Sequence, residues 1–100
     1  MKYIEKPIIS NKIKHPKLVV RRFRLHRFVP GIYVIRTAND PDEVEIIKAD
    51  FYKQKYIRKE DKYIIAFAAD YDDALEIVTK LTQEAIQALG RPSIKEYIFK

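Results

Sequence analysis

The chain has 100 residues, of which 47% are hydrophobic and 34% charged, with a net charge of +6 and no cysteine. This composition excludes intrinsic disorder, disulfides and thiol chemistry, and the length allows one domain with a modest core. No uncharged run approaches the roughly 18 apolar residues of a membrane span, and the first residues lack the apolar stretch of a signal peptide, so we expect a cytoplasmic protein without membrane contact.

The positive charge is concentrated at the start of the chain. Residues 1–36 contain ten of the 20 Lys and Arg and one acid, so they carry a net charge of +9, whereas the rest of the chain carries −3. Such a block attracts phosphate or acidic surfaces if it folds onto one face. Its arginines, with their planar forks, suit bidentate phosphate contacts. The alternative interpretation is a solvated basic surface without a ligand.

Residues 1–17 mix lysines with isoleucines and contain Pro7 and Pro16. Each proline removes a backbone donor and favours extended geometry in the residue before it. The segment is therefore predicted to be an edge strand or a basic N-terminal arm.

The pattern of residues 18–29 favours a strand, because apolar residues alternate with arginines and Pro30 and Gly31 follow. In a strand, Phe23 and Leu25 would face the core, while Arg22, Arg24 and His26 would form a row on the opposite face. Residues 31–38 are predicted to form the next strand.

Residues 39–58 carry contradictory signals. The segment 40–43 has the pattern of a helix start, with Asp40 as N-cap, Pro41 in the first turn and Glu43 completing a capping box. The β-branched and aromatic residues that follow favour a strand. We expect a turn over 39–43 and then a strand over 44–57, interrupted near Asp50, with a helix as the alternative.

The last third of the chain predicts two strands around one long helix. Residues 63–69 form an apolar run of buried-strand length. A helix is predicted over 71–89, capped by Asp70 or Asp72 and ended by Gly90, and a strand over 93–99. The expected fold is α+β, an antiparallel sheet of four to six strands with this helix on one face. A winged-helix fold is the alternative if residues 41–50 and part of the N-terminal segment are helical.

No catalytic motif is recognised, and the residues resemble no known family closely enough to name one. Ser10 and Ser93 lie outside any nucleophile elbow, and neither His15 nor His26 has an identifiable partner. The acids at 70, 72 and 73 are interpreted as helix caps and dipole partners rather than magnesium ligands. Pro41-Asp42 followed by Glu60-Asp61-Lys62 has the letters of a PD-(D/E)xK nuclease, but Glu60 and Lys62 fall in a charged turn. We expect a protein that is not an enzyme and has no metal or cofactor.

The sequence therefore favours a small non-enzymatic nucleic-acid-binding protein, with DNA slightly preferred to RNA. Cations would neutralise phosphates and release counterions. Tyrosines interleaved with lysines at 52–56 resemble the stacking platforms of single-strand binders but also suit ordinary strand packing. The alternative function is an interaction or regulatory module that binds an acidic partner or forms a homodimer through a sheet edge. The predicted nucleic-acid-binding residues are Lys12, Lys14, Lys17, Arg21, Arg22, Arg24, His26, Arg27 and Arg36.

Overall fold

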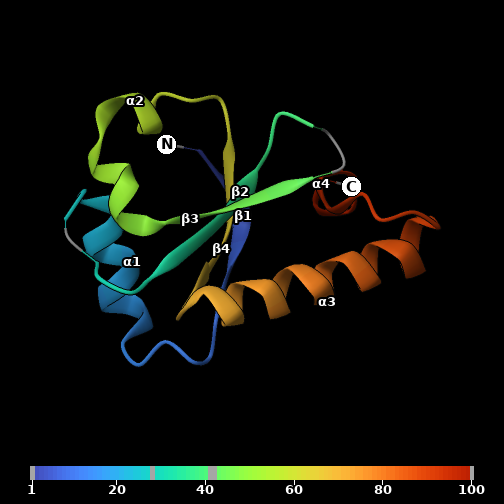
Figure 1. Cartoon of the computed structure of the whole chain (residues 1–100), viewed down its shortest axis with the longest axis horizontal. Coiled ribbons are helices and arrows are strands. Elements are labelled where there is room, and N and C mark those ends of the chain that lie inside the picture. Colours follow the sequence, from blue (N-terminus) through green and yellow to red (C-terminus); the bar gives the residue numbers. More distant parts are fainter. Residues whose placement is uncertain (1, 28, 41–42, 100) are drawn as a thin grey trace.

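The computed structural model describes residues 2–27, 29–40 and 43–99 (Figure 1). Their strands form one sheet in the order β1-β4-β2-β3. The strands are β1 (Lys2–Ile9), β2 (Tyr33–Thr37), β3 (Val44–Lys48) and β4 (Tyr63–Ala68). β2 is antiparallel to both of its neighbours, but β1 is parallel to β4. The sheet is therefore mixed and four-stranded, which corrects the expectation of an antiparallel sheet of four to six strands.

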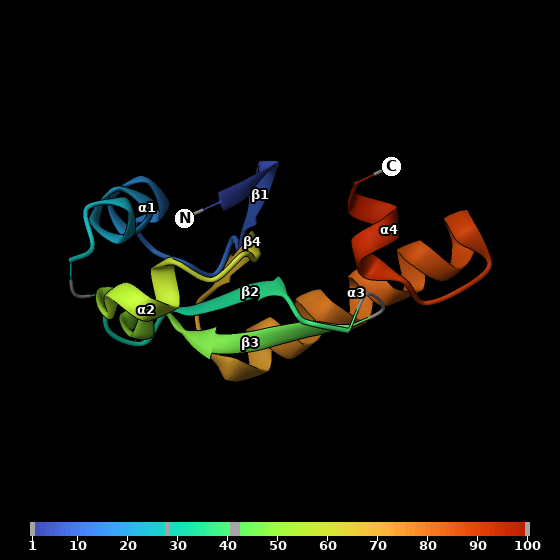
Figure 2. The same cartoon turned by 90° about the horizontal axis from the view of Figure 1, so that it is seen from above.

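Helices cover both faces of this sheet. They are α1 (Pro16–Arg24), the 3-10 turn η1 (Ala49–Lys53), α2 (Lys55–Arg58), α3 (Tyr71–Leu89) and α4 (Ile94–Ile98). The view from above shows α1 and α2 close to one end of the sheet, with α3 crossing it and α4 near the end of α3 (Figure 2). One apolar cluster includes Phe23 and Tyr52 on the α1 side, and the other includes Ala74, Leu81 and Ile94 on the α3 side.

The centre of the sheet supplies both clusters because side chains alternate across a strand. Val34 and Phe67 belong to the α1-side cluster, whereas Ile35 and Ala68 belong to the α3-side cluster. The β2–β4 register shifts between Ile35 and Arg36, where the Ile35↔Ala66 pair is followed by Arg36↔Ile64. This shift leaves an extra residue in β4, as in a β-bulge.

The segment predicted as the clearest strand is a helix. Pro16 occupies the first turn of α1, where its missing N–H costs no hydrogen bond. Val19, Val20 and Phe23 are spaced to share one helical face, and they pack into the α1-side cluster. The prediction that Arg22, Arg24 and His26 form a row on a strand surface is therefore wrong. Phe28, which the predicted strand also included, lies outside the described residues.

The parallel pair joins strands that are far apart along the chain. Parallel strands need a long crossover between them, because a tight hairpin cannot join them. The connection from β1 to β4 contains α1, β2, β3, η1 and α2, and it brings the chain back so that β4 lies parallel to β1.

Two further segments differ from the prediction. The C-terminal segment is α4 rather than a strand, and its N-cap Ser93 accepts a hydrogen bond from the backbone N–H of Glu96. The strand expected over 44–57 ends at Lys48, and residues 49–58 form η1 and α2 instead. The helix start proposed at 40–43 includes Pro41 and Asp42, which lie outside the described residues.

The other elements agree with the sequence prediction. β1 is an edge strand, β2 and β4 fall within the predicted strands, and α3 spans Tyr71–Leu89 with Asp70 as N-cap. Gly90 follows α3 in the left-handed conformation at φ +78°. Because β3 covers residues 44–48, the winged-helix alternative fails. Among the described helices, none is long and apolar enough to cross a membrane.

Candidate nucleic-acid interface

The exposed side of α1 is basic because the helix separates its residues into two faces. Val19, Val20 and Phe23 turn toward the sheet, which leaves the charged residues and Leu18 facing solvent. Lys17, Arg21 and Arg24 follow one another at four- and three-residue spacing, so they form one ridge of the helix. The last turn of α1 is rich in arginine, which the negative end of the helix dipole stabilises.

The loops on either side of α1 extend this cationic area. We call it the α1 basic surface, and its members are all exposed. They are Lys14, Lys17, Arg21, Arg22, Arg24 and Arg27. The sequence between Lys6 and Arg36 contains no Asp or Glu. Within the described chain, Lys14, Lys17, Arg21 and Arg27 have no carboxylate within ion-pair distance.

Two of the predicted binding residues are engaged inside the molecule. Lys12 Nζ lies 2.9 Å from Glu76 Oε2 and 3.9 Å from Asp73 Oδ1, so it links the β1–α1 loop to α3. The hydrogen bond and the charge of Glu76 raise the pKa of Lys12. The guanidinium of Arg24 lies 5.1 Å from the centre of the Tyr3 ring, a cation–π contact that attaches α1 to β1.

His26 ends α1 in a strained backbone conformation. Its φ is +59°, the left-handed region that glycine usually occupies after a helix. The N–H of His26 donates to the carbonyl of Phe23 and the N–H of Arg27 to the carbonyl of Arg22, which is the Schellman pattern. Local desolvation and then the charge of Arg58 lower the pKa of His26. This shift disfavours the charged imidazolium, so His26 is a weaker candidate for phosphate contact than the arginines around it.

Arg36 does not belong to this surface. It is 5% exposed within β2 and lies among acids. Its Nε is 2.5 Å from Glu45 Oε1 and its Nη2 is 3.2 Å from Glu60 Oε1, while Nη1 donates to the Tyr52 hydroxyl at 3.4 Å. Lys62 Nζ contacts the same two carboxylates at 2.8 and 3.4 Å. The two cations and two acids form a compact internal network, and Arg36 is oriented away from any external phosphate.

This network also includes part of the nuclease-like pattern. Glu60 is paired with both Lys62 and Arg36, and Lys62 is also paired with Glu45, so the Glu60 carboxylate and the Lys62 ammonium are already compensated. Asp42, the other acid of that pattern, lies outside the described residues. Over the ranges that the structure describes, no group of three or more His, Cys, Asp or Glu is arranged to hold a metal. The acids near α3 act as caps: Asp70 accepts from the N–H of Asp73, and Asp73 accepts from the N–H of Ala69.

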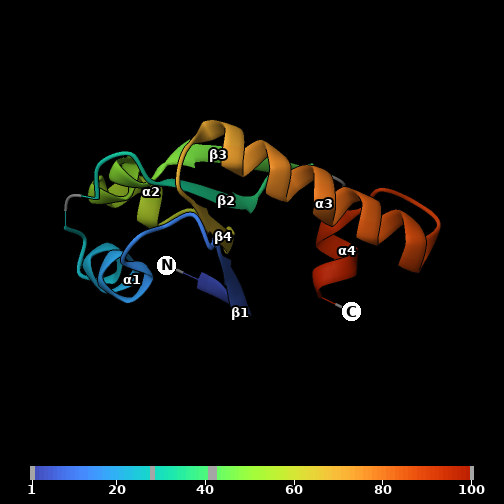
Figure 3. The same ribbon diagram turned by 90° about the horizontal axis from the view of Figure 1, so that it is seen from below.

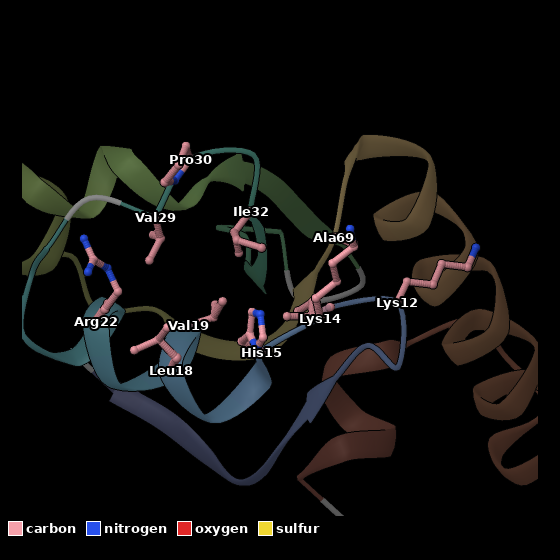
Figure 4. A pocket seen from close by; sticks show the side chains of 11 residues that line it. Lys12, Lys14, His15, Leu18, Val19, Arg22, Val29, Pro30, Ile32 and Ala69 are labelled. Atoms are coloured by element: carbon pink, nitrogen blue, oxygen red, sulfur yellow. The ribbon is translucent and has the colours of Figure 1, made fainter.

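Two hollows lie on the sides of α1. The first, about 550 Å³, lies between α1 and the segment from Val29 to Ile32, and Lys14, His15 and Arg22 are among its lining residues (Figure 4). The second, about 510 Å³, lies between α1 and the end of β1 and is lined by Lys17, Arg21 and Arg24 with apolar neighbours. Of the described residues that line either hollow, none is acidic and several are cationic.

The sequence analysis missed the cations of α2. The lower view shows α2 beside α1 (Figure 3), and the ring of Phe23 lies 5.0 Å from that of Tyr52 in η1. Arg58 donates to the carbonyls of Tyr52 and Lys53 and is close enough to His26 to lower its pKa. The cluster of four cations in residues 53–59 was the available signal, but interpreting this segment as a strand separated it from α1.

Comparisons with known proteins found no similar protein. No family model matches this chain, and the searches of curated proteins and of solved structures found no match.

Proposed function

We propose that this chain is a small non-enzymatic nucleic-acid-binding protein that contacts phosphates through the α1 basic surface. The observation that carries the proposal is the set of exposed cations that form no ion pair with any described residue: Lys14, Lys17, Arg21 and Arg27. Cations on a protein surface usually have carboxylates nearby, although each such pair contributes little to stability. Here the sequence supplies no carboxylate from Lys6 to Arg36. A repeated anion is the ligand that such a surface attracts most strongly.

The mechanism is phosphate neutralisation with counterion release. Each phosphate contact contributes about −0.9 to the slope of log affinity against log salt for duplex DNA, and about −0.7 for a single strand. Sequence preference would require an arginine to reach a base edge. Arg36 and Lys12 are left out because their charges are already paired. We retain the slight preference for DNA over RNA as part of the proposal.

The test is a salt titration with duplex DNA, single-stranded DNA and RNA. The double substitution Arg21→Ala with Arg27→Ala removes two cations that lack internal partners, and it should flatten the duplex slope by about 1.8. Lys80→Ala is the matched control because Lys80 is an exposed cation of α3, and it should leave the slope unchanged. If no polymer binds at about 50 mM salt, or if the double variant has the parental slope, the proposal is wrong.

A second candidate function is self-association through an open sheet edge. β1 pairs only with β4 among the described strands, so its other edge presents unpaired backbone groups. Ile8 and Ile9 near the end of β1 are 37% and 42% exposed. Light scattering at two protein concentrations distinguishes this function: a mass that stays monomeric excludes it, and a dimer that Ile9→Lys dissociates supports it.

A further inference from the structure

The hollow of about 550 Å³ beside α1 combines an apolar interior with a cationic rim. Leu18 and Val19 of α1 face Val29 and Ile32 across it, and Pro30 closes one side (Figure 4). Its volume lies within the range of about 300–1,000 Å³ that is typical of small-molecule sites. The hollow therefore has room for an organic ring, and apolar walls to cover it.

The rim carries charge on more than one side of this interior. Arg22 lies at one end, and Lys14 and His15 lie at the other, while Lys12 extends away toward α3 (Figure 4). Among the residues that the structure describes, no acidic side chain lines the hollow, and neither does any Asn, Gln, Ser or Thr. A ligand that fits has one apolar flat group and a negative charge on each side of it.

We propose that the hollow holds one unstacked base of a single-stranded nucleic acid while the rim cations contact the phosphates on either side of that base. This inference rests on the proposed function and adds the strandedness of the ligand. A nucleic-acid strand fits because it places a phosphate next to every base, whereas a duplex hides the base faces in its stack. Because the walls are aliphatic and His15 is the one polar ring, the site accepts a base without reading its edge.

The test compares two strands of equal length and charge by fluorescence anisotropy at low salt. One is an oligothymidylate, and the other is an abasic deoxyribose-phosphate strand. Stacking one base on an aromatic ring is worth a factor of about 5 to 150 in known single-strand binders. Because the walls here are aliphatic apart from His15, the thymidylate should bind more tightly than the abasic strand by a factor near the lower end of that range, about 5-fold. A duplex of the same length serves as a third probe and should show no gain from its bases.

Two leucines of the same helix region provide matched variants. Leu18 is 52% exposed and lines the hollow, whereas Leu25 is 56% exposed and does not. Leu18→Gln should bring the affinity ratio of the two strands toward one without changing the affinity of the abasic strand. Leu25→Gln should preserve the parental ratio. Circular dichroism of both variants confirms that each is folded.

The outcomes separate this inference from the proposed function. If both strands bind equally to the parental protein, the base site is wrong but phosphate binding stands. If neither strand nor the duplex binds, the proposed function fails and the base site with it. If the strands fail but an acidic leucine-containing peptide binds and Leu18→Gln weakens it, the hollow accepts a protein side chain and the inference is overturned.

A fluorescent base reports on the hollow directly. The fluorescence of a 2-aminopurine base in the strand should increase on binding to the parental protein and stay low with Leu18→Gln.

Discussion

Replacing Arg36 by methionine should destabilise the protein without changing its phosphate contacts. The Arg36 side chain is 6% exposed, and it compensates Glu45 and Glu60, whose side chains are 32% and 33% exposed. Removing one partner of a buried ion pair costs about 3–5 kcal/mol. The expected cost here is smaller because both carboxylates are partly hydrated and Lys62 still contacts them. We therefore expect a loss of about 2–3 kcal/mol in the free energy of unfolding.

Urea denaturation measures this loss directly. With a slope of about 1.5 kcal/mol per molar urea for a domain of this size, the midpoint of Arg36→Met should fall by about 1–2 M. Arg21→Met is the matched control, because Arg21 is exposed on α1, and its stability should change by less than about 0.5 kcal/mol. The salt titration should give the opposite pattern. Arg21→Met should flatten the slope of log affinity against log salt by about 0.9, and Arg36→Met should leave it unchanged.

The structural interpretation of Arg36 fails if its midpoint stays at the parental value. It also fails if Arg36→Met, at urea-free conditions where circular dichroism shows it folded, lowers the salt slope as much as Arg21→Met does. In that case Arg36 would leave its network to contact phosphate, and its inclusion among the predicted binding residues would be correct.

Three further predictions concern pH, α1 and α3. Desolvation raises the pKa of Glu60, but the charges of Arg36 and Lys62 outweigh it and lower the pKa overall. The unfolded chain then binds more protons, so the urea midpoint should fall as pH drops from about 5 to 3, and fall less in Arg36→Met. Glycine tolerates the positive φ of His26, so His26→Gly should increase the free energy of unfolding by about 0.5–1 kcal/mol. That gain corresponds to a rise of about 2–8 °C in the melting temperature, and a change to glycine at an ordinary φ should give no such rise. Asp70→Ala should lower the free energy of unfolding by about 1 kcal/mol, because the cap at the start of α3 is lost. If Asp70 is a cap and not a metal ligand, Mg²⁺ should leave the melting temperature of the parental protein unchanged.

Elements with strong end signals could be predicted from the sequence. Asp70 caps α3 and Gly90 follows it in the left-handed conformation, so both ends of that helix are set by local chemistry. The apolar run of β4 is too short for a helix spanning the core and is free of breaking residues. In both cases local propensity and tertiary packing favour the same structure.

Residues 18–29 could not be assigned with the same rule because two periods fit them. Val19, Phe23 and Leu25 alternate with arginines at a period of two, but Val19, Val20 and Phe23 also form a helical face. β-branched valines favoured the strand, while Pro16 at the first turn favoured the helix. The helix is selected by the packing of Phe23, whose ring lies edge-on against those of Tyr52 and Phe67. Both partners lie far along the chain, so this contact could not be predicted from the local sequence.

The candidate site shows the same division between local and distant information. The exposed cations of α1 and its flanking loops could be found from the sequence because the charge of the segment can be counted without knowing its fold, although a strand would have turned Arg21 and Arg27 to the same face as Phe23. Arg36 could not be excluded from sequence because its partners, Glu45 and Glu60, reach it through the β2–β3 pairing and the return of the chain toward β4. A cation beside acids in space is paired and one without them attracts anions, so the position of the acids, more than the number of arginines, determines which residues the proposed phosphate contacts can use.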